Sequence, residues 1–145
     1  MKRRRFVQGA AALVAIGARS VHAALPAIPS LDEWLAGRTP RFARIKLGIP
    51  AIADNGFAVP MRVMVEGPFT PGAHVKSIRL FSEANPVPDM AVFEFPVPVD
   101  RVEIESRIRL AGTQQVVAAA ETADGNVYAI ATEVIVTLAG CMDGT

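Results

Sequence analysis

The sequence contains very little cysteine and histidine. Among its 145 residues there are one cysteine, Cys141, and two histidines. A single cysteine excludes a disulfide within the chain, and it excludes a zinc or iron–sulfur site built from several cysteines. Aromatic residues make up only 6% of the chain, with one tryptophan. Any thiol chemistry of this protein therefore depends on one side chain.

The whole chain also lacks an excess of charge of one sign. It has 15 Lys and Arg against 14 Asp and Glu, which gives a formal net charge of +1. Nucleic-acid-binding domains normally have a basic surface and a high pI, so we expect no nucleic-acid partner. The length fits one domain, and a content of 51% hydrophobic and 20% charged residues argues against disorder.

The basic residues cluster at the N-terminus, where Arg3 and Arg4 lie in a basic run. An apolar stretch over 9–18 and a small-residue cleavage site ending at Ala23 follow, which is the order of a secretory signal. The arginine pair favours the twin-arginine type, with an ordinary secretion signal as the alternative. We therefore predict a twin-arginine signal peptide over 1–23 and a periplasmic location. The apolar stretch is well short of the roughly 20 residues that span a membrane, so no membrane anchor is expected.

The mature chain is predicted to be mildly acidic and rich in β structure. Five basic residues lie within 1–23, so 10 basic residues remain against 14 acidic ones, a net charge of −4. After a lead-in over 24–42, apolar and polar residues alternate in runs bounded by Pro, Gly or Asn. These runs predict strands over 44–47, 59–66, 75–83, 91–95, 101–110, 115–121 and 126–138. Seven short strands without a long helix predict an all-β fold over 43–138, an antiparallel β-sandwich of immunoglobulin-like type.

One short helix is expected ahead of the strands. Ser30, followed three residues later by Glu33, is the pattern of a capping box, in which each side chain bonds the other residue's backbone amide. This pattern predicts a helix over 31–36. Trp34 and Leu35 would pack that helix on the sandwich.

The cysteine lies in a terminal segment, 139–145, beyond the last expected strand. Terminal segments are mobile unless contacts hold them, and glycine adds conformational freedom. We therefore predict a flexible C-terminal arm around Cys141, made of Ala139, Gly140, Met142, Asp143 and Gly144.

The residues alone leave three interpretations of this thiol open. Asp143 and the terminal carboxylate are negative, so they should raise the pKa of the Cys141 thiol. A raised pKa disfavours a self-sufficient cysteine enzyme, whose thiolate is usually stabilised by a nearby positive charge. A carrier thiol activated by other enzymes, an interchain disulfide and an incidental terminal cysteine all remain.

Other reactive side chains are assigned structural roles. His74 stands alone at the start of a strand, so we expect it to have no function. Met61 and Met64 could suggest a copper site, but their odd spacing on a strand places them on opposite faces. Arg and Glu are mixed over 101–109, which predicts cross-strand pairing on a solvated face rather than an anion site. No metal site is expected.

Short matching segments, in order along nearly the whole chain, indicate a known family. They are residues 49–50, 54–56, 59–60, 75–76, 81–88, 107–111, 114–120, 124–125 and 140–141. In this order, with the cysteine near the C-terminus, the sequence resembles the SoxY family, the sulfur-carrying subunits of the periplasmic Sox thiosulfate-oxidation system.

The resemblance implies a non-catalytic carrier with no cofactor other than sulfur bound covalently to Cys141. It implies a heterodimer with a SoxZ-type subunit, which lacks its own export signal and would be exported together with this chain. It also implies transient contacts with the cytochrome SoxAX, with SoxB and, where present, with a sulfane dehydrogenase. An immunoglobulin-like interaction protein with an interchain disulfide, or a periplasmic copper-binding module, are the alternatives.

The terminal arm departs from the pattern of that family. The family's tail is typically Gly-Gly-Cys-Gly-Gly, whereas Ala139 and Met142 flank the Gly140–Cys141 pair here, and Asp143 follows. Met142 adds bulk next to the sulfur and Asp143 adds charge. The arm is therefore expected to suit partner enzymes with wider channels, or a specialised Sox variant.

Overall fold

The structure is a computed structural model, and it describes residues 24–140. This part of the chain forms one short helix and eight strands. They are α1 (Pro29–Leu35), β1 (Ile45–Gly48), β2 (Ile52–Ala53), β3 (Val59–Glu66), β4 (Val75–Ser82), β5 (Asp89–Glu94), β6 (Arg101–Ile108), β7 (Gln114–Thr122) and β8 (Val127–Val136). No helix of the described residues is long and apolar enough to cross a membrane.

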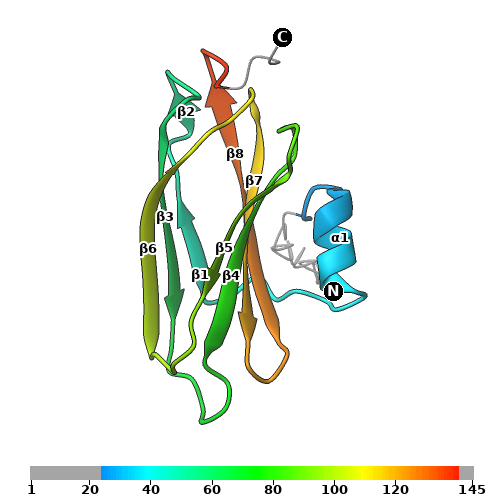
Figure 1. Cartoon of the computed structure of the whole chain (residues 1–145), viewed down its shortest axis with the longest axis vertical. Helices are drawn as coiled ribbons and strands as arrows, with labels where there is room; N and C mark the ends of the chain where they lie inside the picture. Colours follow the sequence, from blue (N-terminus) through cyan, green and yellow to red (C-terminus); the bar gives the residue numbers. More distant parts are fainter. Residues whose placement is uncertain (1–23, 141–145) are drawn as a thin grey trace, which may run out of the picture.

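The strands form two sheets that pack face to face (Figure 1). One sheet has the order β1-β3-β6 and the other has the order β2-β8-β7-β4-β5. Neighbouring strands pair antiparallel, except that β2 pairs parallel with β8. The predicted all-β, immunoglobulin-like sandwich with a short N-terminal helix is confirmed.

Alternating burial along the strands shows how the sequence specifies this sandwich. In β3, Val59, Met61, Val63 and Val65 are all at most 4% exposed, whereas the residues between them face outward or are half-buried. Side chains of this inner row meet those of the opposite sheet in one core. Burial of a Val, Leu or Met side chain contributes about 1.5–3 kcal/mol, so each inward row is a substantial stabilising element.

Helix α1 covers the outer face of the five-stranded sheet, on the side of β4 (Figure 1). Trp34 packs against Phe81 with ring centroids 5.9 Å apart, and Leu35 is 9% exposed. The expected packing of these two residues on the sandwich is therefore confirmed. Ile28 and Leu31 are also buried here, and together these residues form a second, smaller core.

The predicted capping box is wrong. The helix begins at Pro29, its N-cap is Ile28, and no side chain caps it. Proline is favoured in the first helical turn because its missing amide needs no partner there and its φ is already helical. Helical structure therefore includes Ser30, whose Oγ is buried without a hydrogen-bond partner. Burial of Ile28 sets the helix start, in place of a polar cap.

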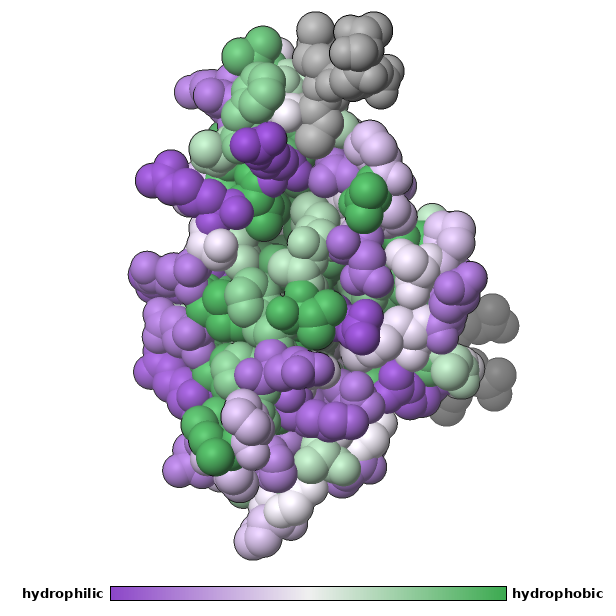
Figure 2. Space-filling model, in the orientation of Figure 1, coloured by the Kyte–Doolittle hydropathy of each residue, from purple (hydrophilic) through white to green (hydrophobic). Residues whose placement is uncertain are grey.

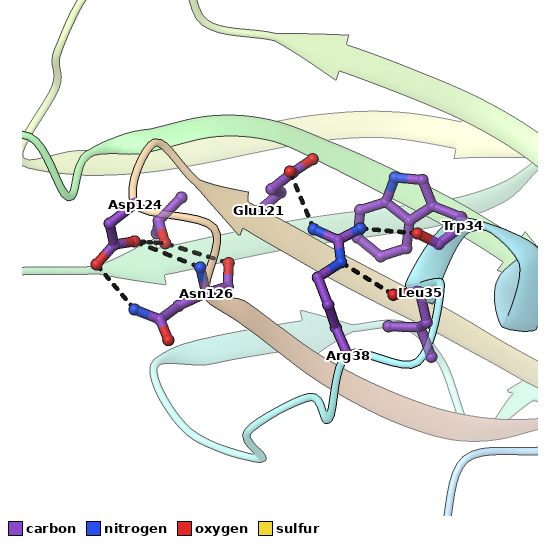
Figure 3. A network of polar contacts seen from close by, with 7 residues as sticks. Trp34, Leu35, Arg38, Glu121, Asp124 and Asn126 are labelled. Atoms are coloured by element: carbon purple, nitrogen blue, oxygen red, sulfur yellow. Dashed lines mark hydrogen bonds and ion pairs between the residues drawn. The ribbon is translucent and has the colours of Figure 1, made fainter.

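Arg38 closes the C-terminal end of the helix (Figure 3). Its guanidinium donates to the carbonyl oxygens of Trp34 at 2.7 Å and Leu35 at 2.9 Å, and to Glu121 on β7 at 3.0 Å. The last carbonyls of a helix have no intrahelical partner. The side chain supplies a donor to the Trp34 carbonyl, and it adds a second donor to the Leu35 carbonyl, which also accepts from the Arg38 amide at 2.9 Å. One side chain thus ties the helix to the five-stranded sheet.

The short strand β2 is absent from the predicted set. Two residues carry no measurable hydrophobic period, so the sequence could not reveal it. Ile52 and Ala53 pair with Ile135 and Val136 near the end of β8. This pairing places the β2–β3 loop beside the segment that follows β8.

Candidate functional site

The candidate site is the end of the sandwich where β2 and the last part of β8 lie together (Figure 1). Cys141 and the expected arm residues Met142, Asp143 and Gly144 lie outside the described residues, as do Arg3, Arg4 and Ala23 of the expected signal. Ala139 and Gly140 are the two arm residues that the structure places. The geometry of the site is therefore that of the segment that leads to the thiol.

Three backbone hydrogen bonds hold this segment, and we call them the exit clamp. The Gly56 amide donates to the Leu138 carbonyl at 2.7 Å, and the Gly56 carbonyl accepts from the Leu110 amide at 2.8 Å. The Gly140 amide donates to the Leu110 carbonyl at 2.7 Å. Three distant segments, the β2–β3 loop, the β6–β7 loop and the chain after β8, are thereby joined at one point.

Both glycines of the exit clamp are required, because backbone atoms of the other clamp segments lie where a β-carbon would stand. A β-carbon on Gly56 would lie 2.4 Å from the Leu110 carbonyl oxygen and 2.6 Å from the Gly140 nitrogen. A β-carbon on Gly140 would lie 2.1 Å from the Gly56 carbonyl oxygen. A side chain at either position would therefore force the neighbouring backbone to move. Both glycines are also buried. Gly140, expected to loosen the arm, instead allows the chain to pack tightly.

Asn85 holds the Leu110 part of the exit clamp from both sides. Its Oδ1 accepts from the Ala111 amide at 2.9 Å, and its Nδ2 donates to the Arg109 carbonyl at 2.8 Å. Gln114, only 4% exposed, donates to the same Oδ1 at 3.0 Å. Leu110 itself is fully buried. The acceptor for the Gly140 amide is thus fixed by side chains as well as by the sheet.

Further polar contacts fix the other two segments. Asn55 Oδ1 accepts from the Phe57 amide at 2.8 Å, a local bond that shapes the turn around Gly56. Thr137 donates from its amide to the Ala53 carbonyl and from its Oγ1 to the Asp54 carbonyl, each at 3.0 Å. The chain after β8 therefore continues beside the β2–β3 loop up to the exit clamp.

Exposed apolar residues lie around the exit clamp. Ile52 is 59% exposed, Phe57 is 45% exposed and Leu138 is 57% exposed. Ile135, the register partner of Ile52, is 48% exposed. Figure 2 shows apolar residues at this end of the molecule, among hydrophilic ones. Such residues are suited to contact another protein, because water solvates them poorly.

A groove opens on the side of the sandwich, between the edge strands β5 and β6. Its volume is about 320 Å³, and its lining includes Met61, Leu80, Met90, Phe93 and Ile108. Figure 2 shows an apolar band over the middle of this face. No group of three or more metal-ligating His, Cys, Asp or Glu side chains occurs among residues 24–140. Polar and charged side chains also line the groove, namely Asn85, Asp89, Ser106, Arg107 and Arg109. The groove is therefore a mixed surface feature, apolar in part, without clustered metal ligands among the described residues.

The predicted placement of the methionines on β3 and of the charged residues on β6 agrees with the structure. Met61 is buried and Met64 is half-buried on the alternate face of β3. Arg62 forms ion pairs with Glu105 and, at 3.4 Å, with Glu103, both on the neighbouring strand β6. The charged face of β6 is thus paired across strands and solvated, as predicted.

The exit clamp was not predicted from the sequence, although its residues lie in segments that the family resemblance singles out. Several of the short segments that carry the family resemblance meet at this point in space. Gly56 lies in 54–56, Asn85 in 81–88, Leu110 in 107–111 and Gly140 in 140–141. Glycines separated by 84 positions show no spacing rule, so their contact needed the structure.

Comparison with known families gives one match over most of the chain. The model of the family described as "Sulfur oxidation protein SoxY" matches residues 32–141. This range contains every residue of the exit clamp, and it ends on Cys141. A comparison with curated proteins finds no match.

Solved structures similar to this chain include superoxide reductases. Neelaredoxin from Ignicoccus hospitalis has 15% identity and a TM-score of 0.50, covering 65% of this chain and 80% of its own. A single-residue variant of that neelaredoxin has 15% identity and a TM-score of 0.51, covering 74% and 91%. A putative superoxide reductase from Thermotoga maritima has 15% identity and a TM-score of 0.50, covering 63% and 84%. At this identity the likeness shows a shared fold alone.

Proposed function

This chain belongs to the SoxY family of sulfur oxidation proteins, and on that basis we propose that it holds thiosulfate-derived sulfur covalently on Cys141. In this proposal the protein is a carrier and other enzymes perform the reactions. The observation that supports it best is that the family match extends to Cys141, the only cysteine of the chain. A single terminal thiol on a rigid sandwich is suited to presenting a bound group to several enzymes in turn.

The proposed chemistry begins with oxidative coupling. The thiol of Cys141 and thiosulfate form a Cys–S–S–SO₃⁻ adduct, releasing one proton and two electrons to a c-type cytochrome of the SoxAX kind. The thiolate is the nucleophilic form of cysteine, so the reaction requires loss of the thiol proton. Without a cationic neighbour in the adjacent sequence, that activation would come from the partner's active site.

The second step is hydrolysis by an enzyme of the SoxB kind. Water adds to the terminal sulfonate sulfur, sulfate and one proton leave, and a persulfide remains on Cys141. A sulfane dehydrogenase, where present, would oxidise that remaining sulfur. The carrier's contribution to each step is to keep the sulfur covalently bound and to hold it in position at the active site of each enzyme, where correct placement of the reacting group raises the rate.

The proposal includes a partner subunit and a location. A SoxZ-type chain would form a heterodimer with this one, and the twin-arginine route would export the folded pair to the periplasm. The apolar band of the β5–β6 groove and the apolar residues near the exit clamp are surfaces that such contacts could cover.

The experiment is thiosulfate-dependent reduction of the cytochrome by the reconstituted components, with wild-type protein and with Cys141→Ser. The proposal predicts that the substitution abolishes electron flow and leaves the unfolding midpoint unchanged. Equal electron flow with Cys141→Ser would refute the carrier role. A covalent dimer that is lost in Cys141→Ser, without any sulfur adduct, would instead favour the interchain disulfide.

A further inference from the structure

We propose that Gly56 is a positioning residue for the carrier thiol: through the exit clamp it sets the point at which the segment bearing Cys141 leaves the fold. The proposal rests on the proposed function for what the thiol does. The segment that leads to the thiol differs from a flexible tether, because the hydrogen-bonded part of the chain extends to Gly140, the residue immediately before the cysteine.

The hydrogen bonds of the clamp meet at Gly56 and Leu110. Gly56 is bonded on both sides, through its amide to Leu138 and through its carbonyl to Leu110, and Leu110 in turn receives the Gly140 amide. Gly56 and Leu110 are therefore the two central residues of the clamp, each with both of its backbone polar groups used. Gly56, Leu110 and Gly140 are buried, and an unpaired backbone amide or carbonyl is costly in a buried position.

A side chain at position 56 would collide with the clamp. The Gly140 nitrogen lies 2.6 Å from the position of a β-carbon on Gly56, and the Leu110 oxygen lies 2.4 Å from it. These are the two atoms of the hydrogen bond that holds Gly140. A methyl group at position 56 would therefore push apart that bond in particular, which a general packing defect would not do.

Cys141 follows directly after the last residue of the clamp in the sequence. Consecutive Cα atoms across a trans peptide are about 3.8 Å apart, so residue 141 begins one such step from a buried, fixed residue. An enzyme that acts on the thiol must then approach the clamp and the exposed Phe57 and Leu138 beside it. Misplacement of a reacting group by about 1 Å can lower a rate by about a hundredfold. The position of the clamp is therefore relevant to every transfer.

The test compares Gly56→Ala with Gly112→Ala. Gly112 lies in the β6–β7 loop two residues after Leu110, and a β-carbon there meets no atom within 4 Å. A third variant, Val117→Ala, removes buried volume beneath α1, away from the clamp. It serves as a variant whose stability is lowered without any change at position 56.

The first measurement is hydrogen exchange of the Gly140 amide by NMR. We expect it to be at least about tenfold faster in Gly56→Ala than in wild type, and unchanged in Gly112→Ala and Val117→Ala once global stability is accounted for. An unchanged Gly140 rate in Gly56→Ala overturns the proposal. Should Gly56→Ala not fold, Gly140→Ala replaces it, since its β-carbon would meet the Gly56 oxygen from the other side.

The second measurement is kcat/KM for sulfur loading of Cys141 by the partner cytochrome, beside the rate of alkylation by iodoacetamide. We expect kcat/KM to fall about tenfold or more in Gly56→Ala relative to Val117→Ala, with alkylation no slower. Equal kcat/KM in these two variants overturns the positioning role. Failure of wild type to accept sulfur at all refutes the carrier function itself, which separates the two failures.

Discussion

The carbonyl oxygen of Gly56 lies 2.1 Å from the place that a β-carbon on Gly140 would occupy. The two residues are 84 positions apart in the sequence, and the contact between them is possible only because neither has a side chain. It joins the β2–β3 loop to the chain after β8, immediately before the only cysteine. The sandwich thus determines where the thiol-bearing residue starts.

The first prediction concerns Asn85. Asn85→Ala removes the acceptor for the Ala111 amide and for Gln114, and the donor to the Arg109 carbonyl. Of these partners only Gln114 is buried. Loss of a partner for a buried polar group costs about 1–3 kcal/mol, so we expect a loss of that size in the free energy of unfolding. Chemical denaturation measures it. Asn85→Asp, which keeps the oxygen acceptor, should lose less, and equal losses would contradict this account of the side chain.

How far the sequence predicts the fold depends on the kind of signal. Strand β3 is predicted to the residue, over 59–66, because eight alternating residues give a clear period. The start of α1 is missed because a polar cap was expected, whereas Pro29 and the burial of Ile28 determine it. The exit clamp was not predicted, since backbone hydrogen bonds between distant loops leave no local pattern.

The second prediction concerns Arg38. Arg38→Lys keeps the positive charge but loses the planar fork that bonds two helix carbonyls and Glu121 at once. We expect Arg38→Lys to lose most of the stability that Arg38→Ala loses, about 1–2 kcal/mol in total. Thermal unfolding measures both variants. Arg101→Lys on the solvated face of β6 is the control and should change stability by less than about 0.5 kcal/mol. Full rescue by lysine would show that charge alone matters.

The third prediction concerns pH. A hydrogen bond from the Thr122 hydroxyl is the main cause that lowers the pKa of Asp124, and bonds from Asn126 add to it (Figure 3). A carboxyl group with a lowered pKa in the folded state stabilises the fold above its unfolded value, near 3.9. That contribution is lost as the pH falls from this value through the lower folded pKa.

NMR titration of the Asp124 carboxyl tests this directly. Thr122→Val removes the hydroxyl donor, so the pKa of Asp124 should rise toward its ordinary value. Asp124→Asn should remove this group's share of the acid dependence of stability and leave the slope above about pH 5 unchanged. A pKa that does not respond to Thr122→Val would show that the hydroxyl is not the cause.

The fourth prediction concerns the residues after the thiol. Met142→Gly combined with Asp143→Gly reduces bulk and removes a negative charge next to Cys141. We expect faster loading by enzymes with narrow channels, and a lower pKa of the thiol because a neighbouring negative charge is removed. Turnover with each partner enzyme and the pH dependence of alkylation measure the two effects. Unchanged values of both would show that this departure from the glycine-rich tail has no consequence.

The most direct test of the carrier account is the intact mass of the protein isolated from thiosulfate-grown cells, before and after treatment with a reductant. The account predicts a thiosulfonate or persulfide adduct on Cys141, removed by the reductant and absent from Cys141→Ser. Protein with an unmodified Cys141 under these conditions would contradict it.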